Sequence, residues 1–121
     1  MHTAAFEALV LEALNTLPPE FAQHLANVEV QVMLRPTQAQ LQAVGLGPSA
    51  TLYGLYEGVP LPQRSGGAVL MPDMITIFQE PIERDFPEPE ALRRQVRRTV
   101  LHELAHFFGI SDQRLHELDA Y

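Results

Sequence analysis

Residues 102–112 read His-Glu-Leu-Ala-His-Phe-Phe-Gly-Ile-Ser-Asp, and the rest of the chain is organised around this stretch. Residues four apart on an α-helix lie on one face about 5–6 Å apart, so His102 and His106 can direct two imidazoles at one metal ion. This is the spacing of a zinc site. Glu103 is rotated about 100° from His102, which lets its carboxylate hold and deprotonate a metal-bound water. It is therefore the candidate general base.

The residues after His106 supply candidates for a third metal ligand. Gly109 can end the helix with a positive φ, and a chain that turns there can bring Asp112 back toward the metal. Water would then take the fourth position. An N-cap role for a short terminal helix explains an aspartate at this position equally well. His116 and Glu117 are the alternative ligands, and one of them could instead hydrogen-bond to a ligating histidine.

The residues around the two histidines predict that this part of the helix is buried. Residues 90–99 form an amphipathic, arginine-rich half, whereas residues 100–108 are apolar on nearly every side. Burying His102, Glu103 and His106 there without a partner would cost on the order of several kcal/mol, which a metal ion would remove. The alternative is a structural cluster in which the histidines hydrogen-bond to backbone or carboxylate groups.

The composition fits one domain over residues 1–121, because 46% of the residues are hydrophobic and the length leaves no room for a second core. A formal net charge of −7 argues against nucleic-acid binding, which normally needs a basic face. All eight basic side chains are arginine, and four of them gather within residues 93–98. We expect this cluster to be a solvated helix face that pairs with Glu88 and Glu90.

Cysteine is absent, which excludes a disulfide framework, a thiolate metal site and a cysteine nucleophile. Any zinc must therefore be held by His, Asp or Glu. No apolar run approaches the roughly 18 residues that span a bilayer, and the amino terminus lacks the charged flank and apolar core of a signal peptide. We expect a cytoplasmic protein that binds neither nucleic acid nor a membrane; nothing in the sequence indicates its oligomeric state.

Helices are predicted where apolar residues recur at three- and four-residue intervals. This pattern indicates a helix over residues 3–17 with Thr3 as its N-cap, followed by a short helix over residues 20–26. Residues 35–50 contain a helical turn bounded by loops. Residues 81–89 are proline-rich and acidic, and we interpret them as a linker into the last long helix.

Strands are predicted where apolar and polar residues alternate or β-branched residues gather. Residues 28–34 and 74–78 show this pattern most clearly, and residues 68–71 form a shorter candidate. Two glycines interrupt residues 52–58, which suits a strand or hairpin that bends or lets another backbone approach. Pro72 and Asp73 form a turn. Together these elements predict an α+β domain, in which a short mixed or antiparallel sheet packs against an N-terminal helix and a C-terminal active-site helix.

The pattern His-Glu-x-x-His-x-x-Gly-x-x-Asp over residues 102–112 resembles the active-site signature of zincin metallopeptidases. It is close to the extended metzincin form, but aspartate stands where most metzincins have a third histidine. Nine residues follow Asp112, too few for the methionine turn that lies beneath the metal in metzincins.

The chain is more narrowly similar to a family of small bacterial minimal zincins. The similarity rests on residues 52–58, on residues 72–77 and on Leu-His-Glu-Leu at residues 115–118. It extends from about Val28 to the end of the chain, although only the metal motif is highly specific.

This resemblance implies a zincin-like fold and zinc held by His102, His106 and Asp112, with Glu103 as the base. It also implies hydrolysis of a peptide or protein substrate, bound as an added strand along a sheet edge near residues 52–57. The alternative is a non-catalytic metal-binding or partner-binding module that retains the fold.

A donor for the developing oxyanion is also needed, and Tyr53 or Tyr56 could supply it. Packing in the core or on the surface is the competing role for each of these two tyrosines.

Overall fold

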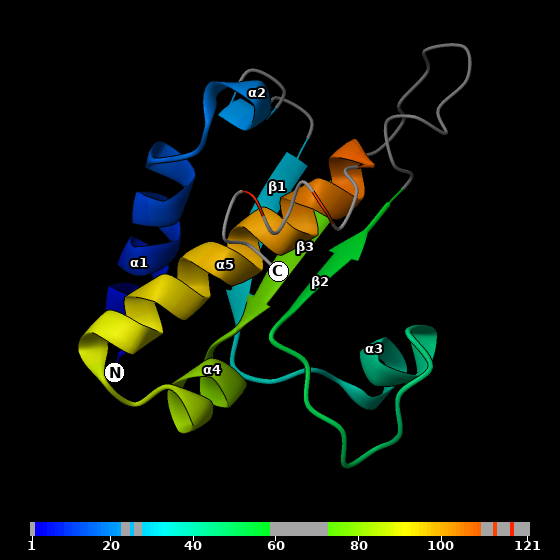
Figure 1. The fold of residues 1–121 in the computed structure, drawn as a ribbon. Coiled ribbons are helices and arrows are strands. Elements are labelled where there is room, and N and C mark those ends of the chain that lie inside the picture. Colours follow the sequence, from blue (N-terminus) through cyan, green and yellow to red (C-terminus); the bar gives the residue numbers. More distant parts are fainter. Residues whose placement is uncertain are drawn as a thin grey trace, which may run out of the picture.

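The computed structural model describes residues 2–22, 25, 28–58, 73–109, 113 and 117, and Figure 1 shows the order of their helices and strands. The elements are α1 (Thr3–Asn15), α2 (Pro19–Ala22), β1 (Val28–Met33), α3 (Gln38–Ala43), β2 (Gly54–Glu57), β3 (Asp73–Phe78), α4 (Gln79–Asp85) and α5 (Pro89–Phe108). The predicted α+β class is confirmed.

The described strands form one mixed sheet in the order β1-β3-β2. β1 pairs with β3 in parallel, and β2 pairs with β3 antiparallel, so that Val30 and Tyr56 both lie beside Ile75. β3 is the central strand, and its last four residues, 75–78, are fully buried. β2 therefore lies at one edge of the sheet.

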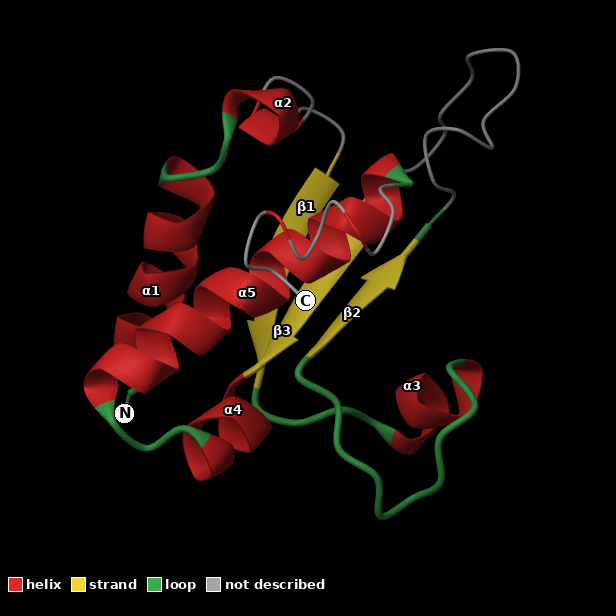
Figure 2. Cartoon of the chain, in the orientation of Figure 1, coloured by secondary structure: helices red, strands yellow, loops and turns green. Residues whose placement is uncertain are grey.

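One face of the sheet is covered by α5, with α1 lying alongside that helix (Figure 2). The core forms where apolar residues of the two helices and the sheet meet, and it includes Phe6 and Val10 of α1, Ile75 and Ile77 of β3, and Val96, Val100 and Leu104 of α5. Within the residues that the structure describes, no helix is long and apolar enough to cross a membrane.

The first two helices differ from the prediction at their ends. α1 begins at Thr3 and its N-cap is His2, so the predicted N-cap role of Thr3 is wrong. The helix ends at Asn15, shortly before Pro18, which disfavours a helical conformation in the residue that precedes it. The Thr16 hydroxyl also donates to the Glu12 carbonyl, at 3.0 Å. α2 spans only Pro19–Ala22, and most of the remainder of the predicted 20–26 helix lies outside the described residues.

Two predictions based on proline were wrong. Part of the predicted 81–89 linker is helical, because Pro81 is the third residue of α4, where a missing N–H breaks no intrahelical bond. Asp73 does not form a turn; it starts β3 and pairs with Val28. Pro72 and the predicted strand over residues 68–71 lie outside the described residues.

Candidate metal centre and active site

α5 carries the two histidines, and its ends fit the signals in the sequence. Pro89 occupies the first turn, where proline is well tolerated. Gly109 follows the last helical residue with φ 69° and ψ 36°, a left-handed conformation that favours glycine. The predicted end of the helix at Gly109 is therefore confirmed, and it lies three residues after His106.

His102 and His106 place their rings side by side one turn apart. The ring centroids are 4.7 Å apart and the ring planes are inclined at 60°. Each ring nitrogen binds zinc at about 2.1 Å, so two imidazoles this close can reach one ion without a change in the helix. The chemistry of this donor pair, two imidazoles and no thiolate, fits zinc.

Glu103 is the buried member of the motif, with a relative exposure of 7%. Its Oε1 lies 3.5 Å from Nδ1 of His106. Burial raises the pKa of Glu103 to about 7, although a hydrogen bond from the Tyr56 backbone N–H opposes this shift. A carboxyl with a pKa near neutrality can both accept and return a proton, as a general base requires.

The register of the sheet explains how Tyr56 reaches this carboxylate. The Tyr53 carbonyl accepts a hydrogen bond from the Phe78 N–H at 2.8 Å, so the backbone polar groups of Tyr53 point toward β3. Alternate residues of an antiparallel strand direct their backbone groups in opposite directions, so those of Gly54 and Tyr56 point away from β3. The carboxylate of Glu103 therefore sits at the outer edge of β2.

Gly54 allows α5 to lie this close to β2. A Cβ atom at this position would be 2.7 Å from Cγ2 of Thr99 and 3.0 Å from Cγ of Glu103. The glycine is buried, and any larger residue would crowd these two side chains of α5. The glycines suggested a bend or the approach of another backbone, whereas the two nearest groups are side chains of α5.

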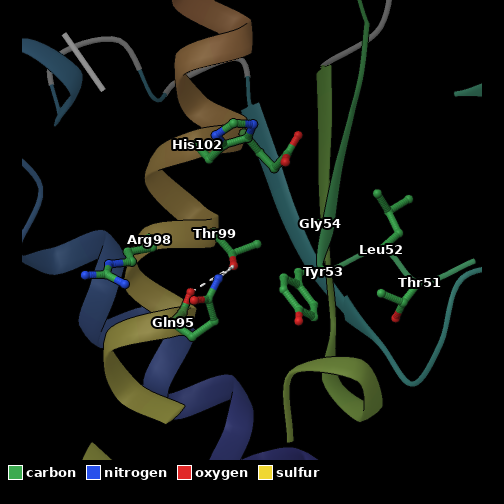
Figure 3. A pocket seen from close by; sticks show the side chains of 9 residues that line it. Thr51, Leu52, Tyr53, Gly54, Gln95, Arg98, Thr99 and His102 are labelled. Carbon is green, nitrogen blue, oxygen red and sulfur yellow. Dashed lines mark hydrogen bonds between the residues drawn. The ribbon is translucent and has the colours of Figure 1, made fainter. Parts of the chain in front are cut away.

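A cleft of about 470 Å³ opens beside Glu103, between α5 and the segment that precedes β2 (Figure 3). Residues 51–54 form one wall. The other wall is the face of α5 formed by Gln95, Arg98, Thr99, His102 and Glu103.

The sequence interpretation did not single out Gln95, Arg98 or Thr99 as residues of the site. Helical spacing could have found them, because Arg98 lies four residues before His102, and Gln95 and Thr99 lie seven before His102 and His106. Thr99 is buried, and its hydroxyl donates to the Gln95 carbonyl at 2.8 Å. These residues thus continue the histidine face of α5 into the cleft.

The wall formed by residues 51–54 is held in place from α4. Tyr53 donates a hydrogen bond to the Asp85 carboxylate, and Arg84 contacts that carboxylate at 2.9 Å and Thr51 Oγ1 at 3.0 Å. The bond to Asp85 raises the pKa of Tyr53, and Arg84 is the main cause that lowers the pKa of Asp85.

Tyr53 and Tyr56, the two candidate donors for the oxyanion, make other contacts in this structure. In Figure 3 the Tyr53 ring points away from His102, as its bond to Asp85 requires. The ring of Tyr56 packs against Phe107 with centroids 6.0 Å apart. Both observations favour the packing roles over oxyanion stabilisation.

The histidines are less buried than the sequence predicted. Leu101, Leu104 and Ala105 are fully buried, but the side chain of His106 is 50% exposed and His102 is half-buried. The expectation that all three ionisable groups are buried was wrong, because the sheet and α1 leave the histidine face of α5 open. An open face is what access of a substrate to a metal would require.

The predicted third ligand cannot be placed, since Asp112 and the alternative His116 lie outside the described residues. Glu117, the other alternative, is described and exposed. Over the described ranges, no three His, Cys, Asp or Glu side chains gather so that they could hold a metal ion.

Comparison with known families agrees with the motif and with the geometry. A family described as zincin-like metallopeptidase matches residues 25–121. The chain belongs to this family. The zincin-like assignment made from residues 102–112 is thus confirmed, and α1 lies outside the matched span. Zincin-like metallopeptidases use a metal, typically zinc, and a search of curated proteins found no match to this chain.

Proposed function

We propose that this zincin-like protein is a zinc-dependent peptidase, with His102, His106 and Asp112 as the metal ligands and Glu103 as the general base. The observation that carries the proposal is the position of Glu103. It is buried, lies 3.5 Å from His106, and borders an open cleft beside an edge strand.

The side chains divide the chemistry of peptide hydrolysis between them. Bound zinc would acidify a water molecule and polarise the carbonyl of the substrate. Glu103 takes the proton from the attacking water on a carboxylate oxygen and later passes it to the departing amine. The Tyr56 N–H holds the carboxylate in position, so Glu103 need not reorient between these two transfers.

The edge of the sheet provides a way to hold the peptide. The Tyr56 N–H donates to Glu103, so an extended segment can add to β2 as a further strand through the outward backbone groups of Gly54 and the Tyr56 carbonyl. The cleft beside this edge lies within the usual volume range of ligand pockets and can take side chains of the added segment.

The variant Glu103→Gln tests the proposal, because glutamine has nearly the same shape but cannot accept the proton. We expect zinc content to be retained and cleavage of a peptide library to fall by about 10²–10⁴-fold. Glu12→Gln is the matched control, since Glu12 makes the same kind of carboxylate contact at a distant surface, 3.4 Å from Arg93. Unchanged hydrolysis by Glu103→Gln, or no hydrolysis by the zinc-loaded parent protein, would reject the peptidase function.

A further inference from the structure

Two hydroxyl groups on opposite walls of the cleft beside Glu103 are hydrogen-bonded within the protein. The Tyr53 hydroxyl donates to the Asp85 carboxylate of α4. On the α5 wall, the Thr99 hydroxyl donates to the Gln95 carbonyl at 2.8 Å and accepts from the Gln95 side-chain amide at 3.1 Å. The hydrogen of each hydroxyl is therefore already used, and neither group has a donor left for a ligand.

The apolar parts of the same two residues border the cleft. With its hydroxyl bonded to the helix, Thr99 points its Cγ2 methyl at β2, and a Cβ atom built at Gly54 would lie 2.7 Å from that methyl. Figure 3 shows the ring of Tyr53 across from Thr99, on the wall formed by residues 51–54. Leu52 lines the same wall. The cleft thus presents an aromatic ring and a methyl group on either side of a glycine.

Charge is scarce on these walls outside the reaction centre. None of residues 51–54 is charged. Arg98 lines the cleft, but in Figure 3 its side chain points away from that wall, and it has an interaction within the protein. A charged ligand group between Tyr53 and Thr99 would lose water without gaining an ion pair from either residue, which is costly. An apolar group there would be stabilised by its removal from water.

We propose that this cleft binds an apolar side chain of the peptide, of the size of leucine or phenylalanine, and so selects substrates that carry such a residue near the cleaved bond. The inference rests on the peptidase function proposed above. Because Glu103 lines the same cleft, a side chain that fills it belongs to a residue close to the carbonyl that reacts. A volume of about 470 Å³ leaves room for such a side chain.

The first test measures binding, so that it does not depend on cleavage. Fluorescent peptides of glycine and serine, blocked at both ends, carry one guest residue: Leu, Asn, Ala, Asp or Lys. Asn matches Leu closely in size but is polar. The peptides are titrated against zinc-loaded Glu103→Gln protein and followed by polarisation. We expect the Leu peptide to bind about tenfold more tightly than the Asn and Ala peptides, and the Asp and Lys peptides to bind most weakly.

The second test uses cleavage by the parent protein. If the guest side chain occupies the cleft, it fixes the register of the peptide relative to Glu103. When Leu is moved along the peptide, the cleaved bond should move with it and stay at a constant distance from it. Mass spectrometry of the products measures this distance, and a cleavage site that ignores the position of Leu would contradict the inference.

Two substitutions of Tyr53, each added to Glu103→Gln, test the aromatic wall. Tyr53→Ala removes the ring and Tyr53→Phe keeps it, while both remove the hydrogen bond to Asp85. They therefore differ in the ring alone. We expect the preference for Leu over Asn to fall below about threefold in Tyr53→Ala and to stay near tenfold in Tyr53→Phe.

Gln95→Glu tests the opposite wall without removing a packed side chain. Gln42→Glu is the matched control, because it makes the same substitution at an exposed position of α3. We expect Gln95→Glu to raise the affinity for the Lys peptide relative to the Leu peptide by about two- to fivefold, and Gln42→Glu to leave this ratio unchanged.

The inference is overturned if no peptide binds, if the Leu and Asn peptides bind equally, or if the preference for Leu survives Tyr53→Ala. Should Tyr53→Ala fail to fold, an unchanged ratio of Lys to Leu affinities in Gln95→Glu overturns it instead. The peptidase function is judged separately, from cleavage by the parent protein and its loss in Glu103→Gln. A peptidase that cleaves all guest peptides alike would refute the apolar side-chain site alone.

Discussion

The close contact between β2 and α5 at Gly54 gives a quantitative prediction for Gly54→Ala. The new Cβ would lie 2.7 Å from Cγ2 of Thr99, 3.0 Å from Cγ of Glu103 and 3.4 Å from the Thr76 carbonyl oxygen. The first distance is too short for two carbon atoms and the second is tight, so the side chains of Thr99 and Glu103 must shift or α5 must move away from β2. Overpacking of this kind lowers the free energy of unfolding by about 1–3 kcal/mol.

Thermal and urea unfolding followed by circular dichroism measure this effect. At about 4 °C per kcal/mol for a domain of this size, Gly54→Ala should lower the Tm by about 4–12 °C. Gly47→Ala is the control, because nothing lies within 4 Å of a Cβ built at Gly47 and its φ is not in the left-handed region. We expect that control to change stability by less than about 1 kcal/mol.

A second substitution identifies the cause of the loss. Thr99→Ser removes Cγ2 but keeps the hydroxyl that donates to the Gln95 carbonyl. In the double variant with Gly54→Ala, we expect about 1 kcal/mol of the lost stability to be recovered as coupling energy. If Gly54→Ala cost no more than Gly47→Ala, or if Thr99→Ser gave no recovery, the described contact between β2 and α5 would be wrong.

Three further predictions concern the charges and the metal of the site. Burial raises the folded-state pKa of Glu103 from 4.5 to about 7, so ionisation destabilises the metal-free protein as pH rises through that range. In urea unfolding, the chelator-treated Glu103→Gln variant should therefore have the same free energy of unfolding as the parent protein at pH 4.5. At pH 8 its free energy of unfolding should be higher by up to about 3 kcal/mol; equal values at both pH values would contradict the raised pKa of Glu103. Tyr53→Phe removes the hydrogen bond to Asp85 and should lower the free energy of unfolding by about 1 kcal/mol with zinc content unchanged, whereas loss of zinc would contradict the separation of Tyr53 from the metal. Zinc at about 100 times its Kd should stabilise the parent by about 2.7 kcal/mol in thermal unfolding, and His106→Ala should remove this gain; a gain that persists would show that His106 is not a ligand.

The elements with strong local signals could be predicted from the sequence. The helix that carries the histidines and its end at Gly109 follow from hydrophobic spacing and from glycine chemistry, both of which act within a few residues. α4 was missed because a proline near the start of a helix and a proline in a linker look alike in sequence. What distinguishes them is burial of Ile82 against the core, which is a tertiary contact.

The parts of the site that depend on tertiary contacts could not be predicted. The motif identified Glu103, but its burial depends on β2 lying beside α5, and periodicity does not reveal which strand packs against which helix. For the same reason Arg98 appeared to be one of four surface arginines. Of that cluster, Arg93 does pair with Glu90, at 3.1 Å, as predicted for a solvated helix face.

The short edge strand β2 bears on whether a bound peptide segment could belong to a folded protein. Its four residues offer about 13 Å of strand, and the outward groups that could pair with an added strand are those of Gly54 and the Tyr56 carbonyl, because the Tyr56 N–H donates to Glu103. A chain segment can add to such an edge only after its own backbone hydrogen bonds are broken. Tightly folded proteins would therefore be cleaved only as fast as they open locally, while frayed termini and denatured chains would be cleaved first. A peptidase that binds its substrate along this edge would select unfolded chains over folded ones before it selects among amino-acid sequences.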